Sequence, residues 1–310
     1  MKIEKEAKYL GDVFNSKGDN SGLTKDRGAK ATRCLVGCLA ECYAVTRGCK
    51  AIKSLILLYK MVYLKTVIFN SEAWILVEED VKKLGVIQMK FLKRMLQVPK
   101  QTPNSLILLE LGLPPIELEV ISRQLNFLHD ILSLPDTDPV RSAYDQQKLF
   151  VYEENWVKGI KRSMRRCNIT ESEEEIASLS DLEWKQLVHT KIQHTALTEL
   201  NKQRAMLKKG VQSNYESLQA QMYFEHLGIW DARTMFKIRS ETLDVKAFKK
   251  FKYEDTICRL CESEVEDTHH IVNICDRIPR ARDEHINLEA SDMDSIKEVI
   301  RCINLFEMAV

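Results

Sequence analysis

The feature of this sequence that most constrains its fold is a group of cysteines and histidines close to the C-terminus. Cys258 and Cys261 are separated by two residues, and His269, His270 and Cys275 follow after a short polar stretch. Two cysteines at this spacing form a knuckle, and a histidine with a third cysteine completes a Cys3His set that Zn²⁺ binds tetrahedrally. His270 is the preferred ligand, because the short helical step from it returns Cys275 to the metal, and His269 is the alternative. The pattern therefore predicts a structural zinc site formed by Cys258, Cys261, His270 and Cys275.

Two points about this group stay open at the level of sequence. The imidazole nitrogen that does not bind the metal needs a partner, and Glu266, Asp267 and Asp276 are the candidates. The alternative to a metal site is three buried thiols beside two surface histidines. The choice decides whether an ion organises this region of the chain.

The composition is that of an ordinary globular protein. The chain has 310 residues, of which 45% are hydrophobic and 29% charged, and its 11 glycines and 7 prolines argue against disorder and against an all-β sandwich. Because the net charge is only +1, any nucleic-acid surface must come from local clustering of basic residues.

Cysteine usage and hydropathy bear on the compartment. Nine cysteines and a charged N-terminal stretch without an apolar core predict a reducing compartment, nuclear or cytoplasmic, rather than secretion. The most apolar segment, 52–76, is interrupted by charged and polar residues, so we expect no membrane-spanning helix.

Helical periodicity dominates the chain, and we expect a mainly α-helical fold with a short N-terminal β element and a small zinc-knuckle-like module. The expected helices cover 23–46, 50–69, a segment from Glu78 to a stop at Pro99, 104–111, 116–134, 140–167, a segment from Glu173, 181–207, 215–224, 231–239, and 293–308 capped by Ser291. Residues 8–20 are expected to form a strand followed by a polar, glycine-containing turn, and the chain does not obviously supply a partner for that strand. The two prolines in 135–139 mark the clearest boundary.

Three groups of basic residues are candidate nucleic-acid contacts. They are Lys83, Lys90 and Arg94 on one helix face; Lys158, Lys161, Arg162, Arg165 and Arg166 around Trp156; and Lys246, Lys249 and Lys250 among Phe248, Phe251 and Tyr253. Cations of this kind contact phosphates, and an aromatic side chain among them can stack on a base. The alternative is that the basic side chains form solvated helix faces and that Trp156 belongs to the core.

Several stretches together resemble the C-terminal part of the reverse transcriptases of non-LTR (LINE-type) retrotransposons. The similar stretches are Lys8-Tyr9-Leu10-Gly11, Tyr63-Leu64-Lys65, Ser71-Glu72-Ala73-Trp74, Leu84-x3-Gln88-x3-Leu92-x-Arg94-Met95-Leu96, Thr102-Pro103, Leu109-Glu110-Leu111-Gly112-Leu113-Pro114, Arg123-Gln124-Leu125-x-Phe127-Leu128, and Cys258-x2-Cys261 followed by Glu266-Asp267-Thr268, His270 and Cys275. The resemblance covers nearly the whole chain. Its specificity comes from the order and spacing of the pieces.

The resemblance implies a division of the chain and a function. Residues 1–20 would be the end of the palm with its primer-grip strand, 21–134 a helical thumb, 140–250 a helical connector, 251–280 the zinc knuckle and 291–308 a C-terminal helix. The implied function is binding of RNA or DNA, with a separate palm-containing chain as a candidate partner and no membrane partner. The rival hypothesis is an all-helical protein-interaction module with a purely structural zinc site.

The chain departs from the family in its catalytic residues. The family polymerises with paired palm aspartates that hold Mg²⁺, and this sequence has no Asp-Asp dipeptide. We therefore assign no catalytic residue, expect Mg²⁺ only for an intact family enzyme, and predict that this chain cannot synthesise DNA by itself.

Overall fold

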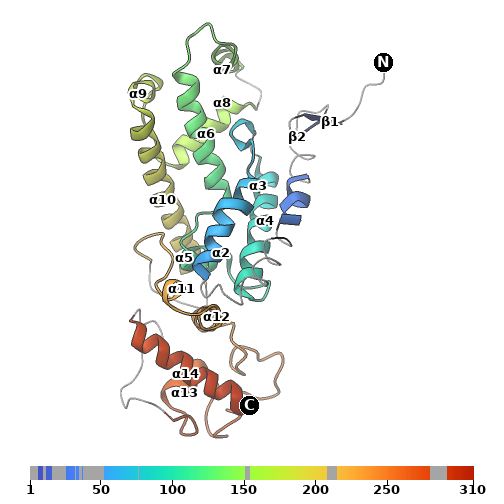
Figure 1. Cartoon of the computed structure of the whole chain (residues 1–310), viewed down its shortest axis with the longest axis vertical. Coiled ribbons are helices and arrows are strands. Elements are labelled where there is room, and N and C mark those ends of the chain that lie inside the picture. Colours follow the sequence, from blue (N-terminus) through green and yellow to red (C-terminus); the bar gives the residue numbers. More distant parts are fainter. Residues whose placement is uncertain are drawn as a thin grey trace.

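The computed structural model describes residues 6–9, 12–15, 26–31, 33, 34, 37, 52–75, 77–150, 154–207, 215–279 and 292–310. The described part is mainly helical, as expected (Figure 1). Its elements are β1 (Glu6–Tyr9), β2 (Asp12–Asn15), α2 (Ile52–Leu58), the π-helical turn η1 (Tyr59–Leu64), α3 (Lys65–Val67), the 3-10 turn η2 (Ser71–Ala73), α4 (Glu78–Leu96), α5 (Asn104–Leu111), α6 (Ile116–Leu132), α7 (Pro139–Leu149), α8 (Trp156–Arg166), α9 (Glu173–Ser178), α10 (Asp181–Ala205), α11 (Tyr223–His226), α12 (Ile229–Arg239), α13 (Thr268–Asn273) and α14 (Met293–Ala309). Among these helices, none combines the length and the apolar character that crossing a membrane requires.

Helix α6 is the centre of the helical body. Its buried residues recur at three- and four-residue steps, among them Leu118, Ile121, Leu125 and Leu128, so more than one of its faces is covered by other elements. Helices α4, α7, α8, α9 and α10 and the turn η2 all pack against it. Figure 1 shows α6 and α10 side by side along the long axis, with α13 and α14 at the opposite end from α7.

Helix α5 has the bounds that the sequence predicts, 104–111. It follows Pro103 and ends at Gly112, whose φ of +61° lies in the left-handed region that glycine adopts without strain. A Cβ atom at Gly112 would come within 2.3 Å of the backbone nitrogen of Ala220. Glycine is therefore required both by the turn and by the close approach of the segment that precedes α11.

The short β element needs no partner from outside the chain, contrary to the expectation from sequence. Strands β1 and β2 pair antiparallel with each other, with Tyr9 opposite Asp12. The stretch 8–15 thus contains the end of one strand and the whole of a second, because the chain reverses between them.

Two expected helices differ most in extent from those observed, and the last helix differs in its cap. The segment 140–167 holds two helices, because the Asn155 side chain accepts the Lys158 N–H at 3.0 Å and starts α8 anew. Of 215–224 only the end is helical, since Tyr215 bonds instead to side chains of other elements. The last helix begins at Met293, and its cap is Asp292 rather than Ser291. The expected helix 23–46 falls largely outside the described residues, and its described positions are helical.

Candidate metal centre and basic surfaces

A tight hairpin brings Cys258 and Cys261 together. Ile257 and Val265 form an antiparallel bridge, and the Cys258 N–H donates to the Glu264 carbonyl at 2.7 Å. Inside this hairpin the Leu260 N–H points at the Cys258 sulfur at 3.5 Å. The two cysteines of the Cys-x2-Cys pair therefore lie on one backbone hairpin.

The short helix α13 supplies the other two candidate ligands. Asp267 caps it by accepting the His270 N–H at 2.7 Å, and the Cys275 N–H donates to the His270 carbonyl at 2.7 Å as the chain leaves the helix. One ligand atom from each of Cys258, Cys261, His270 and Cys275 lies within 4.8 Å of the others. The His270 Nε2 is 3.3 Å from the Cys261 sulfur. This arrangement is compatible with a metal ion bound by all four side chains.

The electrostatics of the cluster suit a cation. The Ser263 hydroxyl donates to the Cys261 sulfur at 3.1 Å and lowers the pKa of that thiol to about 6. Burial, with the neighbouring sulfurs of Cys258 and Cys261, raises the pKa of Cys275 to about 12. Three thiolates at such close range repel one another, and a divalent cation among them would offset that repulsion. The donor set of three sulfurs and one imidazole nitrogen fits Zn²⁺.

The structure decides between the two histidines and corrects the expected imidazole partner. His270 is buried and belongs to the cluster, whereas His269 is exposed and does not. The His270 Nδ1 is buried without a hydrogen-bond partner, and a Glu264 carboxylate oxygen lies 3.6 Å from it. None of the three candidates chosen from sequence bonds to this nitrogen: Asp267 caps α13 and Glu266 bonds elsewhere. Asp276 lies exposed.

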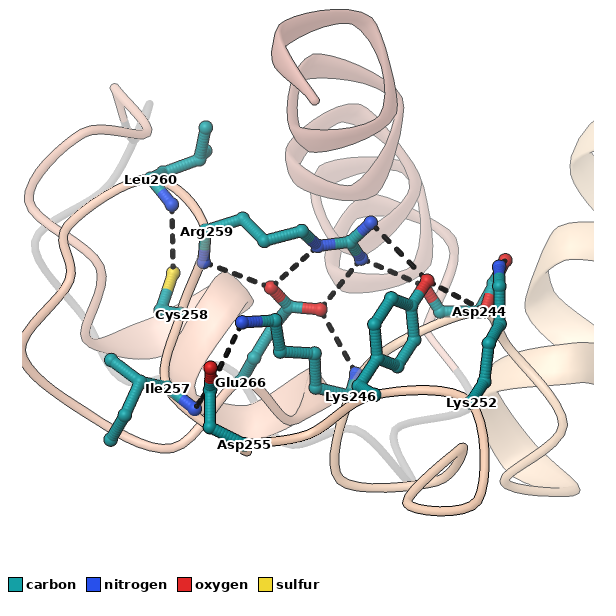
Figure 2. A network of polar contacts seen from close by, with 10 residues as sticks. Asp244, Lys246, Lys252, Asp255, Ile257, Cys258, Arg259, Leu260 and Glu266 are labelled. Atoms are coloured by element: carbon teal, nitrogen blue, oxygen red, sulfur yellow. Dashed lines mark hydrogen bonds and ion pairs between the residues drawn. The ribbon is translucent and has the colours of Figure 1, made fainter.

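A buried ion pair braces the knuckle against the rest of the chain (Figure 2). The Glu266 carboxylate, which is fully buried, accepts bonds from the Arg259 Nε at 2.8 Å, the Arg259 N–H at 3.0 Å and the Lys246 N–H at 2.9 Å. Burial acts to raise the pKa of Glu266, and these hydrogen bonds outweigh it and hold the pKa below its usual range. The Arg259 guanidinium also lies 5.1 Å from the ring of Phe306 in α14. The Arg259–Glu266 pair therefore ties the cysteine hairpin to α14 and to the turns around Lys246.

Several basic residues expected to contact nucleic acid are held by acidic side chains. The pairs are Lys83 with Glu79 (2.9 Å), Arg162 with Glu154 (2.8 Å), Arg166 with Glu117 (2.6 Å) and Glu199 (2.8 Å), and Lys246 with Asp255 (2.7 Å). The remaining candidates are exposed at Lys90, Arg94, Lys161, Arg165 and Lys250 and half-buried at Lys158 and Lys249. The residues of α4 and those of α8 lie on helices that both pack on α6, whereas Lys246, Lys249 and Lys250 belong to the segment leading into the knuckle.

Trp156 belongs to the core and does not serve as a stacking surface. Its side chain is buried, and its Nε1–H donates to the Glu72 carbonyl at 2.7 Å. Phe127 and Tyr144 meet its ring edge-on. The hydrophobic alternative is therefore the correct one for this residue.

Two features were not found from the sequence. Glu110, fully buried in α5, accepts bonds from the Tyr215 hydroxyl, the Tyr223 hydroxyl at 2.6 Å and the Arg239 Nε at 2.8 Å. No local pattern reveals this network, because its partners are more than 100 residues away in the chain. The second feature is Trp230 at the start of α12, which is 66% exposed. No local pattern in the sequence around Trp230 indicates that its side chain is exposed.

No family model, curated protein or solved structure matches this chain. We therefore infer what this chain does from its residues and their geometry.

Proposed function

We propose that this chain is a nucleic-acid-binding part of a retrotransposon-type reverse transcriptase, that it carries a structural zinc ion, and that it lacks the polymerising carboxylates. The observation that carries the proposal is the convergence of Cys258, Cys261, His270 and Cys275 on one point beside a helical body. A helical body followed by a cysteine cluster is also the order of parts that the resemblance implies.

The proposed metal is Zn²⁺, and its role is structural. Four protein ligands fill a tetrahedral shell and leave no position for water or substrate, as in closed structural zinc sites. The ligands come from the hairpin and from the end of α13, so the ion would join two short elements that bury little apolar surface by themselves. Its contribution would be to fold this module.

The proposed nucleic-acid surface is the C-terminal half of α4. Between Asp80 and Glu110 the sequence has six basic residues and no acidic one. Lys90 and Arg94 lie exposed there, one helical turn apart. Such a face offers cations to phosphates without neighbouring carboxylates from its own segment, and its contacts would be independent of base sequence. The paired residues Arg162, Arg166 and Lys246 would contribute less.

The zinc part of the proposal is tested by metal analysis of the purified chain. We expect one zinc per chain in the wild type, loss of zinc in Cys261→Ser, and no loss in Cys34→Ser, which removes a half-buried thiol outside the cluster. Wild-type protein that contains no zinc and does not take it up would refute the metal site.

The nucleic-acid part is tested by affinity for RNA and DNA over a salt series. Removing two phosphate contacts with Lys90→Gln and Arg94→Gln together should lower the slope of log affinity against log salt by about 1.4 for single strands. The control is Lys185→Gln, an exposed lysine of α10 that pairs with Asp181 at 2.7 Å. If zinc is present and the chain binds neither RNA nor DNA, the chain is instead an interaction module with a structural zinc ion.

A further inference from the structure

Trp230 is unlike the other tryptophans of this protein. The chain has four, and Trp74, Trp156 and Trp184 are all buried, whereas Trp230 is 66% exposed. A large aromatic side chain left in water is costly, because the indole would bury a large apolar area if it were packed. A single exposed indole on a folded helix therefore needs an explanation in terms of what contacts it.

The indole is held in place from one side. The Arg233 guanidinium carbon lies 5.3 Å from the centre of the Trp230 ring, within the range of cation–π attraction. Arg233 itself is buried, and its Nε donates to the Met95 carbonyl at 3.0 Å. The ring thus rests on a fixed cation while most of its surface stays open to solvent.

The same contact ties the indole to the last turn of α4. Met95 lies in that turn, directly after the exposed Arg94 and five residues after Lys90. Figure 1 shows α12 beneath the lower end of the helical body, between that body and α14. An open aromatic ring and a basic helix end are therefore linked through one buried arginine.

We infer that Trp230 is a base-stacking platform for single-stranded nucleic acid, with Lys90 and Arg94 holding the adjacent phosphates. The inference rests on the proposed function and gives it a substrate class. A flat π surface stacks on any base, so recognition would be independent of sequence. Bases in a duplex are already stacked on both faces and cannot reach the ring, so the preference would be for unpaired strands.

The first test is the affinity of the zinc-loaded full chain for a fluorescently labelled single-stranded oligouridylate and for an RNA duplex of the same length. Trp230→Ala should weaken binding of the single strand about 5- to 150-fold. Trp230→Phe should retain much of the affinity, and duplex binding should change little. Leu182→Ala on α10 is the matched control, since Leu182 is also 66% exposed.

Two further readouts separate stacking from a loss of fold or of charge. Because the other three tryptophans are buried, quenching of the intrinsic fluorescence by the oligouridylate reports on Trp230, and this quenching should vanish in Trp230→Ala. The slope of affinity against salt should be unchanged in Trp230→Ala, whereas the Lys90 and Arg94 substitutions lower it. Equal circular dichroism and melting temperature would show that the variants are folded.

The outcomes distinguish this inference from the function on which it rests. Wild-type affinity in Trp230→Ala, or an equal loss for single strand and duplex, overturns the stacking platform while leaving phosphate binding by α4 in place. A wild-type chain that binds no nucleic acid overturns both and would assign Trp230 to a protein partner.

Discussion

The buried carboxylate of Glu110 gives the sharpest test of how this fold is held together. In Glu110→Gln the side chain keeps its shape and loses its charge. The carboxylate accepts two tyrosine hydroxyls and the Arg239 Nε, and the Arg239 side chain is only 8% exposed. The substitution therefore leaves a guanidinium buried without its counter-charge.

The expected cost follows from this burial. Removing one partner of a buried ion pair destabilises a protein by about 3–5 kcal/mol, because the remaining charge stays desolvated and unpaired. The amide oxygen can keep the Tyr215 hydroxyl and the Arg239 Nε, and its NH₂ group can donate to the Tyr223 oxygen, so the cost comes from the lost charge. We expect the free energy of unfolding to fall by about 3–5 kcal/mol, against almost no change for Glu174→Gln, which alters an exposed residue of α9.

The assay is urea unfolding of the zinc-loaded chain, followed by circular dichroism, for Glu110→Gln, Arg239→Met and the double variant. Because the double variant removes both charges, it should be more stable than the sum of the single effects predicts. Trp230 fluorescence should also shift in Glu110→Gln, since the network fixes α11 and α12 to α5. If the effects of the two single substitutions on the free energy of unfolding add up in the double variant, Glu110 and Arg239 are not coupled. A loss below about 1 kcal/mol in Glu110→Gln would equally refute a buried ion pair.

Other predictions concern the metal, a turn and a helix cap. Chelation of zinc should remove hydrogen-exchange protection from 257–279 and spare the helical body, because the ion's four ligands all lie within that segment. Gly112→Ala should lower the free energy of unfolding by more than about 2 kcal/mol in urea titration, because the positive φ adds strain and the new Cβ meets Ala220. Ser180→Ala should cost about 1 kcal/mol in the same titration, because the cap of α10 is lost. The Ser180 hydroxyl and N–H donate to Glu183 and hold the pKa of its carboxyl below the usual range. The stability that these hydrogen bonds add is present above the pKa of Glu183 in the unfolded chain and is lost as the pH falls through its pKa in the folded chain. The difference in stability between Ser180→Ala and wild type should therefore shrink in acid.

Sequence alone was sufficient where the determinants are local. The bounds of α5 follow from Pro103 before it and Gly112 after it, and both act within one turn of the helix. The cysteine cluster is similar, because Cys258 and Cys261 are brought together by a hairpin that their own spacing allows. His270 could be preferred to His269 because a helical step sets where Cys275 returns. In these cases the neighbours along the chain are also the neighbours in space.

The sequence failed where a polar side chain finds its partner far along the chain. Trp156 sits among basic residues in the sequence, yet its Nε1–H donates to Glu72, 84 residues earlier, and its ring is buried. Glu110 looks like one acid in an apolar helix, and its three partners come from a segment more than 100 residues later. Neither environment leaves a periodic or local pattern that sequence analysis could detect.

Partners from distant parts of the chain also change which basic residues matter for binding. A basic stretch of sequence shows only how many cations are present, whereas the attraction of a phosphate depends on the net charge of all side chains around it. Arg166 in the α8 cluster faces Glu117 and Glu199, and Lys246 before the cysteine hairpin faces Asp255. Lys83 of the α4 group faces Glu79, so each of the three predicted surfaces is partly neutralised by acidic side chains. The end of α4 has no acid in its own segment and is joined by Arg233 to an exposed indole. Exposed cations and an exposed indole are therefore linked at the end of α4, and the binding experiments centre on α4 and Trp230. Phe251, next to Lys250, is also exposed, at 82%.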